Sequence, residues 1–238
     1  WASFAIALAN GQAVLINPYA TVAEVGAAVA ALIAAMDGLI EEYTVTFQDF
    51  DGRIIEEKRV ERGGGVTLPS EEPTRAGYTF TGWDGNYTNV TQNETVTAAY
   101  SANTDTAYKV EHYQQNVTDE GYTLKDTENL TGTTDASVTA TLKAYAGFNE
   151  NTTHEDRVVV GTIAGDGSLV LKLYYDRETF TVTFKDYDER PLKAETVRYG
   201  GDATAPTEPT RTGYTFTHWA GNYTNVTQNE TVTAAYSA

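Results

Sequence analysis

The stretch GNYTNVTQNETVTAAYSA occupies residues 85–102 and returns, unchanged at all eighteen positions, at residues 221–238. The similarity continues upstream. TRAGYTFTGWDG at 74–85 matches TRTGYTFTHWAG at 210–221, and YTVTFQDFDG at 43–52 matches FTVTFKDYDE at 180–189. Self-similarity over such long stretches indicates repeated structural units. The sequence predicts two copies of a unit of about 60 residues, separated by a different unit of about 76.

Both copies are predicted to consist of β-strands. Apolar residues alternate with threonine over 43–47 and 180–184, which indicates one buried and one solvated face. Asp51-Gly52 is a hairpin signal in the first copy. The second copy has Asp188-Glu189 followed by proline at the same place, and this predicts a different turn. Closing strands are predicted at 95–100 and 231–236.

The middle unit is also predicted to be rich in strands. Its candidates are 108–114, 158–162 and 169–175. The last two flank AGDGS at 164–168, a turn sequence that predicts a hairpin between them.

The first 41 residues differ from the rest, since they are rich in alanine and contain no Lys or Arg. Asn17-Pro18 separates two predicted helices, and Thr21 with Glu24 forms a capping box at the start of the second. Two helices bury little alone, so we expect a third helix before residue 1. The apolar run 25–36 is too short to span a bilayer. The second helix carries an apolar stripe of Val25, Val29, Leu32, Met36 and Leu39.

Composition excludes several classes of function. The 238 residues include 33 acidic and 16 basic side chains, a formal net charge of -17. Such a surface repels nucleic-acid phosphates and anionic lipid headgroups. The chain has no cysteine, so disulfides, thiolate nucleophiles and Cys-ligated zinc are excluded. The 38 threonines, a strand-favouring type, agree with many short strands.

No cluster of catalytic or metal-binding residues is evident in the sequence. His112, His154 and His218 are the only histidines, and they lie far apart without ligand spacing. The triplet at 63–65 is not followed by the lysine of a phosphate loop, so we interpret it as a turn or bulge. We therefore predict no catalytic residue, no cofactor and no metal, and the ligand-binding residues stay undefined.

Each copy contains one carboxylate pair at the same place, Asp49/Asp51 in the first and Asp186/Asp188 in the second. Such a pair could bind calcium or act as an acid and a base. We favour a solvated hairpin end, because no further acid occurs at a fixed spacing in both copies.

The aromatic residues that recur in both repeats admit two interpretations. Trp83 and Trp219, with Tyr78 and Tyr214, could stack on carbohydrate, but a unit of about 60 residues needs its large aromatics in the core. We favour the core for all four. Lys–Asn isopeptide bonds would need a lysine beside an asparagine, and no feature of the sequence places the two together. Nine Asn-x-Thr sequences, the acceptor pattern for N-glycosylation, are interpreted as a coincidence of the Thr-rich repeats. They start at Asn86, Asn89, Asn93, Asn116, Asn129, Asn151, Asn222, Asn225 and Asn229.

The unit YTVTF…DG…PTRAGYTFTGWD…NVTQNETVTAAY resembles the internalin-type B repeat, also called the Listeria–Bacteroides repeat. The resemblance covers 42–102 and 179–238 and is carried mainly by Gly-Tyr-x-Phe-x-x-Trp. It implies a small β-grasp module, like ubiquitin, that occurs in tandem on extracellular bacterial proteins. The copies differ at Glu189 and Pro191 of the second hairpin and at His218, which replaces Gly82.

Weaker resemblances cover the other two segments. The middle unit resembles a mucin-binding-protein (MucBP) repeat in YKVEHY at 108–113, LTGT at 130–133, YAGF at 145–148 and the segment 169–175. This resemblance implies another β-grasp-like module of a surface adhesin. WASF at 1–4 and TVAEV at 21–25 are similar to the second half of a FIVAR module, a three-helix unit of bacterial surface proteins.

We expect an α+β, β-dominated, multi-domain chain: a partial helical bundle at 1–41 and three tandem β-grasp modules at 42–102, 103–178 and 179–238. We expect a non-enzymatic stalk or adhesin, extracellular and attached to the cell wall through regions outside this chain. Alternatives are a carbohydrate or mucin reader with its site in 103–178, and accessory modules of a secreted glycoside hydrolase. Expected partners are a host glycoprotein, mucin, other extracellular protein or glycan, with no nucleic acid and no membrane insertion, and we expect a monomer.

Overall fold

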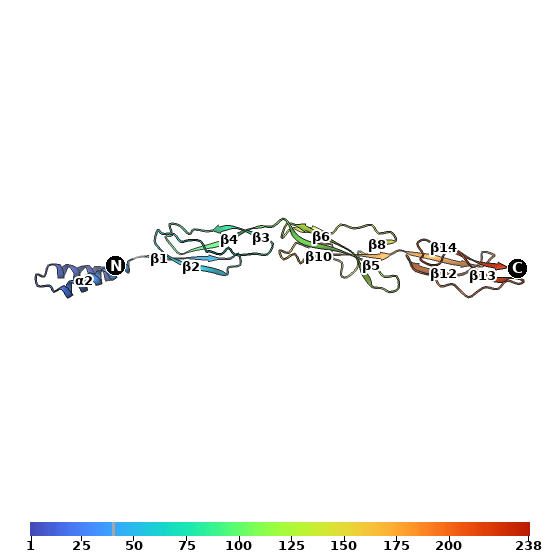
Figure 1. Ribbon diagram of the computed structural model, residues 1–238, viewed down its shortest axis with the longest axis horizontal. Helices are drawn as coiled ribbons and strands as arrows, with labels where there is room; N and C mark the ends of the chain where they lie inside the picture. Colours follow the sequence, from blue (N-terminus) through green and yellow to red (C-terminus); the bar gives the residue numbers. More distant parts are fainter. Residues whose placement is uncertain (40) are drawn as a thin grey trace. The chain divides into compact units, whose positions relative to one another are not determined.

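The computed structural model describes residues 1–39 and 41–238 (Figure 1). The chain divides into two compact units, Trp1–Ser101 and Ala102–Ala238, which are described separately. β-Structure dominates, with several small sheets and two helices in the described part of the chain.

The first unit starts with helices α1 (Ala2–Leu15) and α2 (Val22–Asp37). The predicted capping box is confirmed. The Thr21 hydroxyl accepts from the Glu24 amide at 3.2 Å, and the Glu24 carboxylate accepts from the Thr21 amide at 2.8 Å. This arrangement satisfies two amides that would otherwise lack partners at the helix start. Within the described residues, no helix has both the length and the apolar character needed to cross a membrane.

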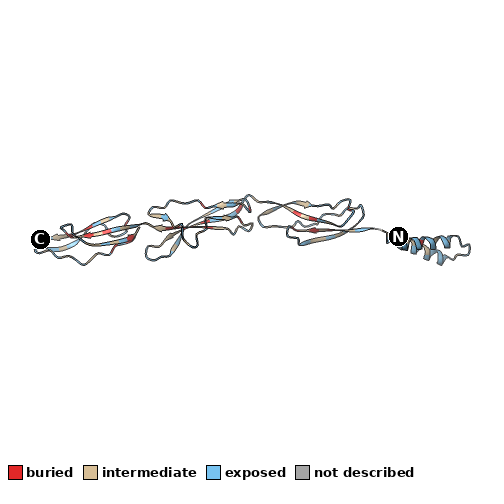
Figure 2. Ribbon diagram, turned by 180° about the vertical axis from the view of Figure 1, so that it is seen from behind, coloured by how far each residue is buried: buried red, intermediate tan, exposed pale blue. Residues whose placement is uncertain are grey.

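The helix pair buries very little of its own surface. Ala7 is the single buried residue of the two helices, and Val25, Val29 and Met36 are each about half exposed. Figure 2 shows both helices almost wholly in the exposed colour. Val25, Val29 and Leu32 of the predicted apolar stripe therefore line an open groove between the helices instead of a core.

The first repeat forms a four-stranded sheet from β1 (Glu42–Gln48), β2 (Ile54–Glu61), β3 (Tyr78–Asp84) and β4 (Glu94–Ala102). The strand order is β2-β1-β4-β3, with β1 antiparallel to β2 and parallel to β4. Val45 and Phe47 are fully buried on β1, as the alternation with threonine predicts. They pack with Val90 and Val96 into the core of this module.

The second repeat has the same sheet, formed by β11 (Thr179–Lys185), β12 (Pro191–Arg198), β13 (Thr215–Ala220) and β14 (Glu230–Ser237). The order is β12-β11-β14-β13, and β11 runs parallel to β14. Val182 and Phe184 take the places of Val45 and Phe47, with Val226 and Val232 packed against them. Each repeat thus has a core of its own.

The prediction of a different turn in the second repeat is wrong. The Asp49 amide donates to the Arg53 carbonyl at 2.8 Å, and the Asp186 amide donates to the Arg190 carbonyl at 2.9 Å. The turns need a positive φ at the same place, which is +84° at Gly52 and +65° at Glu189. Glu189 adopts a left-handed conformation that glycine adopts without steric cost.

The middle module lies in the second unit and contains six strands: β5 (Thr106–Gln115), β6 (Tyr122–Gly132), β7 (Ser137–Thr139), β8 (Phe148–Glu150), β9 (Val160–Thr162) and β10 (Val170–Arg177). Its main sheet has the order β6-β5-β10-β8, again with a parallel central pair, β5 and β10. Leu171, Leu173 and Tyr175 on β10 and Val110 on β5 form its core.

The predicted hairpin over 158–175 is wrong in its pairing. β9 pairs with β7 in a separate two-stranded sheet, and only an isolated bridge between Val158 and Lys172 joins its segment to β10. The turn itself is present, since the Gly167 amide donates to the Ala164 carbonyl at 2.9 Å. The partners of β10 are β5 and β8, which lie far away in sequence and leave no local signal.

Candidate functional site

A buried polar cluster of the first repeat surrounds Asp49, which lies just after β1 and is only 2% exposed. One carboxylate oxygen accepts from the Tyr100 hydroxyl at 2.7 Å and from the Phe50 amide at 2.8 Å. The other accepts from the Arg53 guanidinium at 2.9 Å. We call Asp49, Arg53 and Tyr100 the carboxylate latch, because they tie the β1–β2 turn to β4.

The latch keeps its carboxylate charged. Burial by itself raises the pKa of Asp49, but the hydrogen bonds from Tyr100, Phe50 and Arg53 outweigh it, and the pKa lies below its ordinary value. Burial and the neighbouring Asp49 raise the pKa of Tyr100 to about 12. The pair therefore consists of a carboxylate and a neutral phenol near neutral pH, which is a structural arrangement and not an activated one.

The second repeat contains an equivalent latch. Asp186 is 2% exposed and accepts from the Tyr236 hydroxyl at 2.7 Å, the Tyr187 amide at 2.9 Å and the Arg190 guanidinium at 3.1 Å. The hydrogen bond from Tyr236 is the main reason that the pKa of Asp186 is lowered. In both latches, the buried carboxylate thus accepts from a tyrosine hydroxyl, from the backbone amide of the next residue and from an arginine guanidinium.

The prediction of a solvated hairpin end is therefore wrong for Asp49 and Asp186. It holds for their neighbours Asp51 and Asp188, which are exposed and accept from the amides two residues later. Both oxygens of each buried carboxylate already accept from protein donors. Within residues 1–39 and 41–238, no group of three or more His, Cys, Asp or Glu side chains could hold a metal ion.

Beside each latch, an arginine lies between two aromatic rings. The Arg75 guanidinium lies 4.2 Å from the ring centre of Phe50 and 3.7 Å from that of Tyr78. Arg211 does the same in the second repeat, at 4.1 Å from Tyr187 and 3.8 Å from Tyr214. Such cation–π contacts favour one position of the Gly-Tyr segment against the hairpin.

The aromatic residues therefore have two different roles. Trp83 packs edge-on against Phe47 with ring centres 5.1 Å apart, and Trp219 packs in the same way against Phe184 at 5.2 Å. The core interpretation is confirmed for both tryptophans. It is wrong for Tyr214, which is 44% exposed, and the ring of its counterpart Tyr78 likewise stacks on an arginine outside the core cluster.

The middle module contains a buried histidine that the sequence did not distinguish. His112 on β5 is fully buried, and its Nδ1 lies 3.0 Å from the Tyr175 hydroxyl. That hydroxyl accepts from the Lys143 amide at 3.1 Å, so its own proton is free to go to Nδ1. This arrangement favours the tautomer that carries hydrogen on Nε2.

Nε2 of His112 faces a charged pair without a good hydrogen bond. It lies 3.5 Å from a carboxylate oxygen of Glu128, which pairs with Lys143 at 2.7 Å. Burial is the main cause that lowers the pKa of His112, and the Lys143 charge adds to it, whereas Glu128 and Asp126 oppose it. The imidazole is thus held neutral near neutral pH.

A second aromatic group of the middle module surrounds Tyr174, on the opposite face of β10 from the core. The His154 ring is stacked on Tyr174 with centres 3.6 Å apart, and Tyr113 is stacked at 5.0 Å. Asn151 donates to the Tyr122 hydroxyl at 3.0 Å and to Asp176 at 3.1 Å. The structure thus places His112 and His154 in separate clusters. The third histidine, His218, is exposed on β13 of the second repeat.

The remaining sequence candidates have structural roles. The triplet at 63–65 follows β2 as a turn, in which the Gly63 amide donates to the Val90 carbonyl at 2.7 Å, so the turn interpretation is confirmed. Two asparagines of the Asn-x-Thr sequences support strands. Asn93 accepts from the Thr44 amide and Asn229 from the Thr181 amide, both at 2.9 Å.

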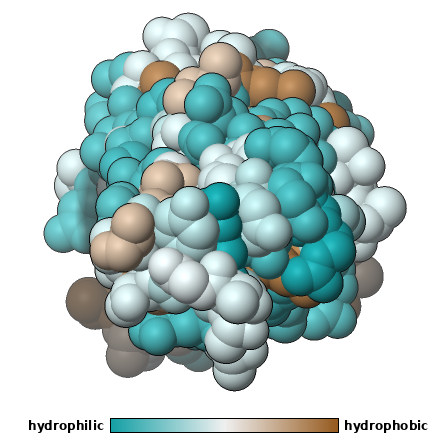
Figure 3. Space-filling model, turned by 90° about the vertical axis from the view of Figure 1, so that its right-hand side faces the viewer, coloured by the Kyte–Doolittle hydropathy of each residue, from teal (hydrophilic) through white to brown (hydrophobic). Residues whose placement is uncertain are grey.

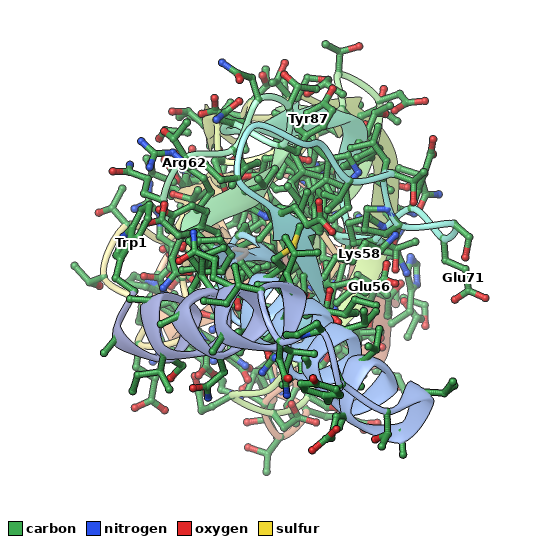
Figure 4. All side chains as sticks on the ribbon, turned by 90° about the vertical axis from the view of Figure 1, so that its left-hand side faces the viewer. Trp1, Glu56, Lys58, Arg62, Glu71 and Tyr87 are labelled. Carbon is green, nitrogen blue, oxygen red and sulfur yellow. The ribbon has the colours of Figure 1, made fainter. Side chains whose placement is uncertain are left out.

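The edge strand of the first repeat carries charged side chains. Figure 4 shows Glu56 and Lys58 on the edge strand β2, where they form an ion pair at 3.2 Å, and Glu71 extending from the following loop. Charged side chains on an edge strand oppose pairing with another sheet. The face in Figure 3 is mainly hydrophilic to neutral, with small separate apolar areas.

Comparison with known families agrees with the duplicated geometry. The model of the Listeria-Bacteroides repeat domain matches residues 43–111 and 180–237, which together are more than half of the chain. No curated protein gives a significant match. The match identifies a bacterial repeat protein. With two copies of the sheet, the core and the latch, this chain belongs to the Listeria-Bacteroides repeat domain family.

Proposed function

We propose that this chain is a non-enzymatic segment of an extracellular bacterial surface protein, in which folded modules separate a binding region from the cell and add weak contacts of their own. The observation that carries the proposal is the duplication of a complete module with its own core and latch. Duplicated polar clusters whose donors and acceptors are already paired favour a repeated building block over a reaction centre.

The composition supports the same proposal. A net charge of -17 keeps a repeated protein soluble, and like charges on successive modules repel each other. Weak sites gain strength when they are linked, because the second binding event becomes intramolecular. An adhesin can therefore function without a deep pocket in any single module. We also propose that each of the three modules is β-grasp-like, on the basis of the mixed sheet with a parallel central pair.

Small-angle X-ray scattering of the full chain tests the spacer role. A single globule of 238 residues would have a radius of gyration of about 18 Å, from the scaling of compact proteins. We expect a value at least 1.5 times larger. A radius close to that of the globule would contradict the proposal. Protease treatment of intact cells tests the location, and a segment protected from the enzyme would exclude surface display.

A second proposal, a glycan or mucin reader in residues 103–178, has one observation in its favour. The partly exposed rings of Tyr113, Tyr122 and His154 surround Tyr174 beside the polar groups of Asn151 and Asp176. Sites for small ligands combine aromatic surface with a few fixed polar groups. Binding to mucin or a glycan array should be lost in Tyr113→Ala and retained in Tyr187→Ala. Absence of binding to both probes would exclude this role.

A further inference from the structure

The second unit contains a contact between the middle module and the second repeat, formed around Arg177 at the end of β10. The Arg177 guanidinium donates to the Gln115 carbonyl at 2.7 Å, at the end of β5, and to the Tyr199 carbonyl at 2.8 Å, just after β12. Its charge also lies 4.8 Å from the ring centre of Phe148. One side chain thus joins the two modules through two carbonyl groups.

Tyr199 fits closely against the middle module. A Cβ atom added at Gly147 would lie 2.2 Å from the Tyr199 ring, so only glycine allows this contact. The backbone is tied at the same place, since the Glu178 amide donates to the Gly147 carbonyl at 2.9 Å and the Tyr199 amide donates to the Glu178 carbonyl at 2.7 Å. The ring of Tyr199 also meets Phe148 edge-on, with centres 6.1 Å apart.

Arg198 makes the third connection, to the turn between β5 and β6. Its guanidinium donates to the Asp119 carbonyl and pairs with the Glu120 carboxylate. The turn is held in shape by the Asp119 side chain, which accepts from the Asn116 amide group and the Gly121 amide, both at 2.7 Å. The second repeat therefore presents a cation to an acidic turn of its neighbour.

The first repeat has the same backbone but different side chains at this place. The Arg62 amide donates to the Glu41 carbonyl at 2.8 Å, as Tyr199 does to Glu178. Glu61 and Arg62 occupy the positions of Arg198 and Tyr199. The Arg62 guanidinium pairs with the Glu41 carboxylate at 2.7 Å. The repeats thus differ at their leading end, while their last eighteen residues are identical.

We propose that Arg198 and Tyr199 form an adaptor that fixes the second repeat to a middle-type module, and that Glu61 and Arg62 make the first repeat unable to take this place. With the pair Glu-Arg, a carboxylate would face Glu120 and a guanidinium would lie near Arg177. Repulsion between like charges excludes the wrong neighbour, just as complementary contacts select the right one. The pair at the end of the second strand of each repeat, β2 or β12, therefore determines whether the repeat packs firmly against a middle-type module that precedes it.

Spin labels test the adaptor in the full chain, which contains no natural cysteine. The exposed positions Thr131, on β6, and Thr215, on β13, accept labels as Thr131→Cys and Thr215→Cys. Pulsed electron spin resonance should give one narrow distance distribution for the parent. The double substitution Arg198→Glu with Tyr199→Arg introduces the residues of the first repeat and should at least double the width.

A second pair of variants keeps the test decisive if the double substitution prevents folding. Gly147→Ala places a methyl group against Tyr199. Gly213→Ala is the matched control, because the φ of Gly213 is +82°, close to the +76° of Gly147, and the space around Gly213 is open. We expect broadening for Gly147→Ala and the parental width for Gly213→Ala. An unchanged width in the double variant, or in Gly147→Ala when the double variant does not fold, would overturn the proposal.

Discussion

Removal of one hydroxyl from the first latch, by Tyr100→Phe, is expected to destabilise the first repeat and leave the second unaffected. The ring keeps its edge contacts with Phe50 and Phe80, whose centres lie 6.0 and 5.8 Å away. Buried Asp49 keeps the Phe50 amide and the Arg53 guanidinium as donors and loses one hydrogen bond. A hydrogen bond to a charged group contributes about 1.5–3 kcal/mol, and we expect a loss in this range.

Hydrogen exchange followed by mass spectrometry measures this loss separately in each repeat. The strands β1 and β11 differ in sequence, EYTVTFQ against TFTVTFK, so their peptides are distinguishable. Since every 1.4 kcal/mol corresponds to a factor of ten, exchange in β1 should accelerate by about 10- to 100-fold. The peptide from β11 is the internal reference and should keep its rate.

Tyr43→Phe is the matched control, because it also removes a phenolic hydroxyl from the first repeat. That hydroxyl donates to Glu41 at 3.2 Å in an exposed setting, and we expect a loss of less than about 0.5 kcal/mol. Equal effects of Tyr100→Phe and Tyr43→Phe would refute the idea that burial of Asp49 makes the latch important. Equal acceleration in β1 and β11 would refute the independence of the two cores.

Three further predictions concern other elements. Because burial lowers the pKa of His112 in the folded state, the unfolded chain binds its proton first as the pH falls. The middle module should therefore be fully stable above pH 6.5 and lose up to about 1.4 kcal/mol of stability per pH unit as the pH falls from there toward the lower pKa of the folded state. In thermal unfolding at several pH values, His112→Phe should abolish this dependence, and a pH-independent parent would contradict the prediction. Glu189→Gly should stabilise the second repeat by about 0.5–1 kcal/mol in denaturant titration, since glycine has no steric cost at φ +65°. Gly52→Ala should destabilise the first repeat. A loss of stability in Glu189→Gly would show that the ion pair between Lys185 and Glu189 outweighs the backbone strain. Thr21→Ala should remove the capping box and lower the stability of α2 by about 1 kcal/mol. Circular dichroism during heating measures this loss, and an unchanged helical signal would contradict the stabilising role of the cap.

The sequence predicts the elements of this protein better than their contacts. The alternation of apolar residues with threonine places β1 and β11 correctly, and Thr21 with Glu24 correctly marks the start of α2. Both are local signals, because side-chain periodicity and capping depend on residues a few positions apart. The pairing of β9 with β7 depends on residues about 23 positions apart, and the local turn at 164–168 suggested another partner.

The latch shows why the polar clusters were harder to predict. Asp49 and Tyr100 are 51 residues apart, and each alone is an ordinary residue of a turn or a strand. Recurrence of the same pair as Asp186 and Tyr236, 50 residues apart, was the available signal. The adaptor required the opposite comparison, since its residues are found where the two repeats differ.

The parallel central pair of each sheet has a consequence for mechanical load. In the first repeat, β1 is the entry strand and β4 the exit strand, and they are neighbours that run in the same direction. A pull on the two ends of the module therefore slides one strand along the other, so the hydrogen bonds between them are loaded together and not broken one after another. Val45 to Gln48 of β1 face four residues of β4, whereas β5 and β10 are paired over six residues. Under tension, the main sheet of the middle module would thus be the last of the three four-stranded sheets to yield.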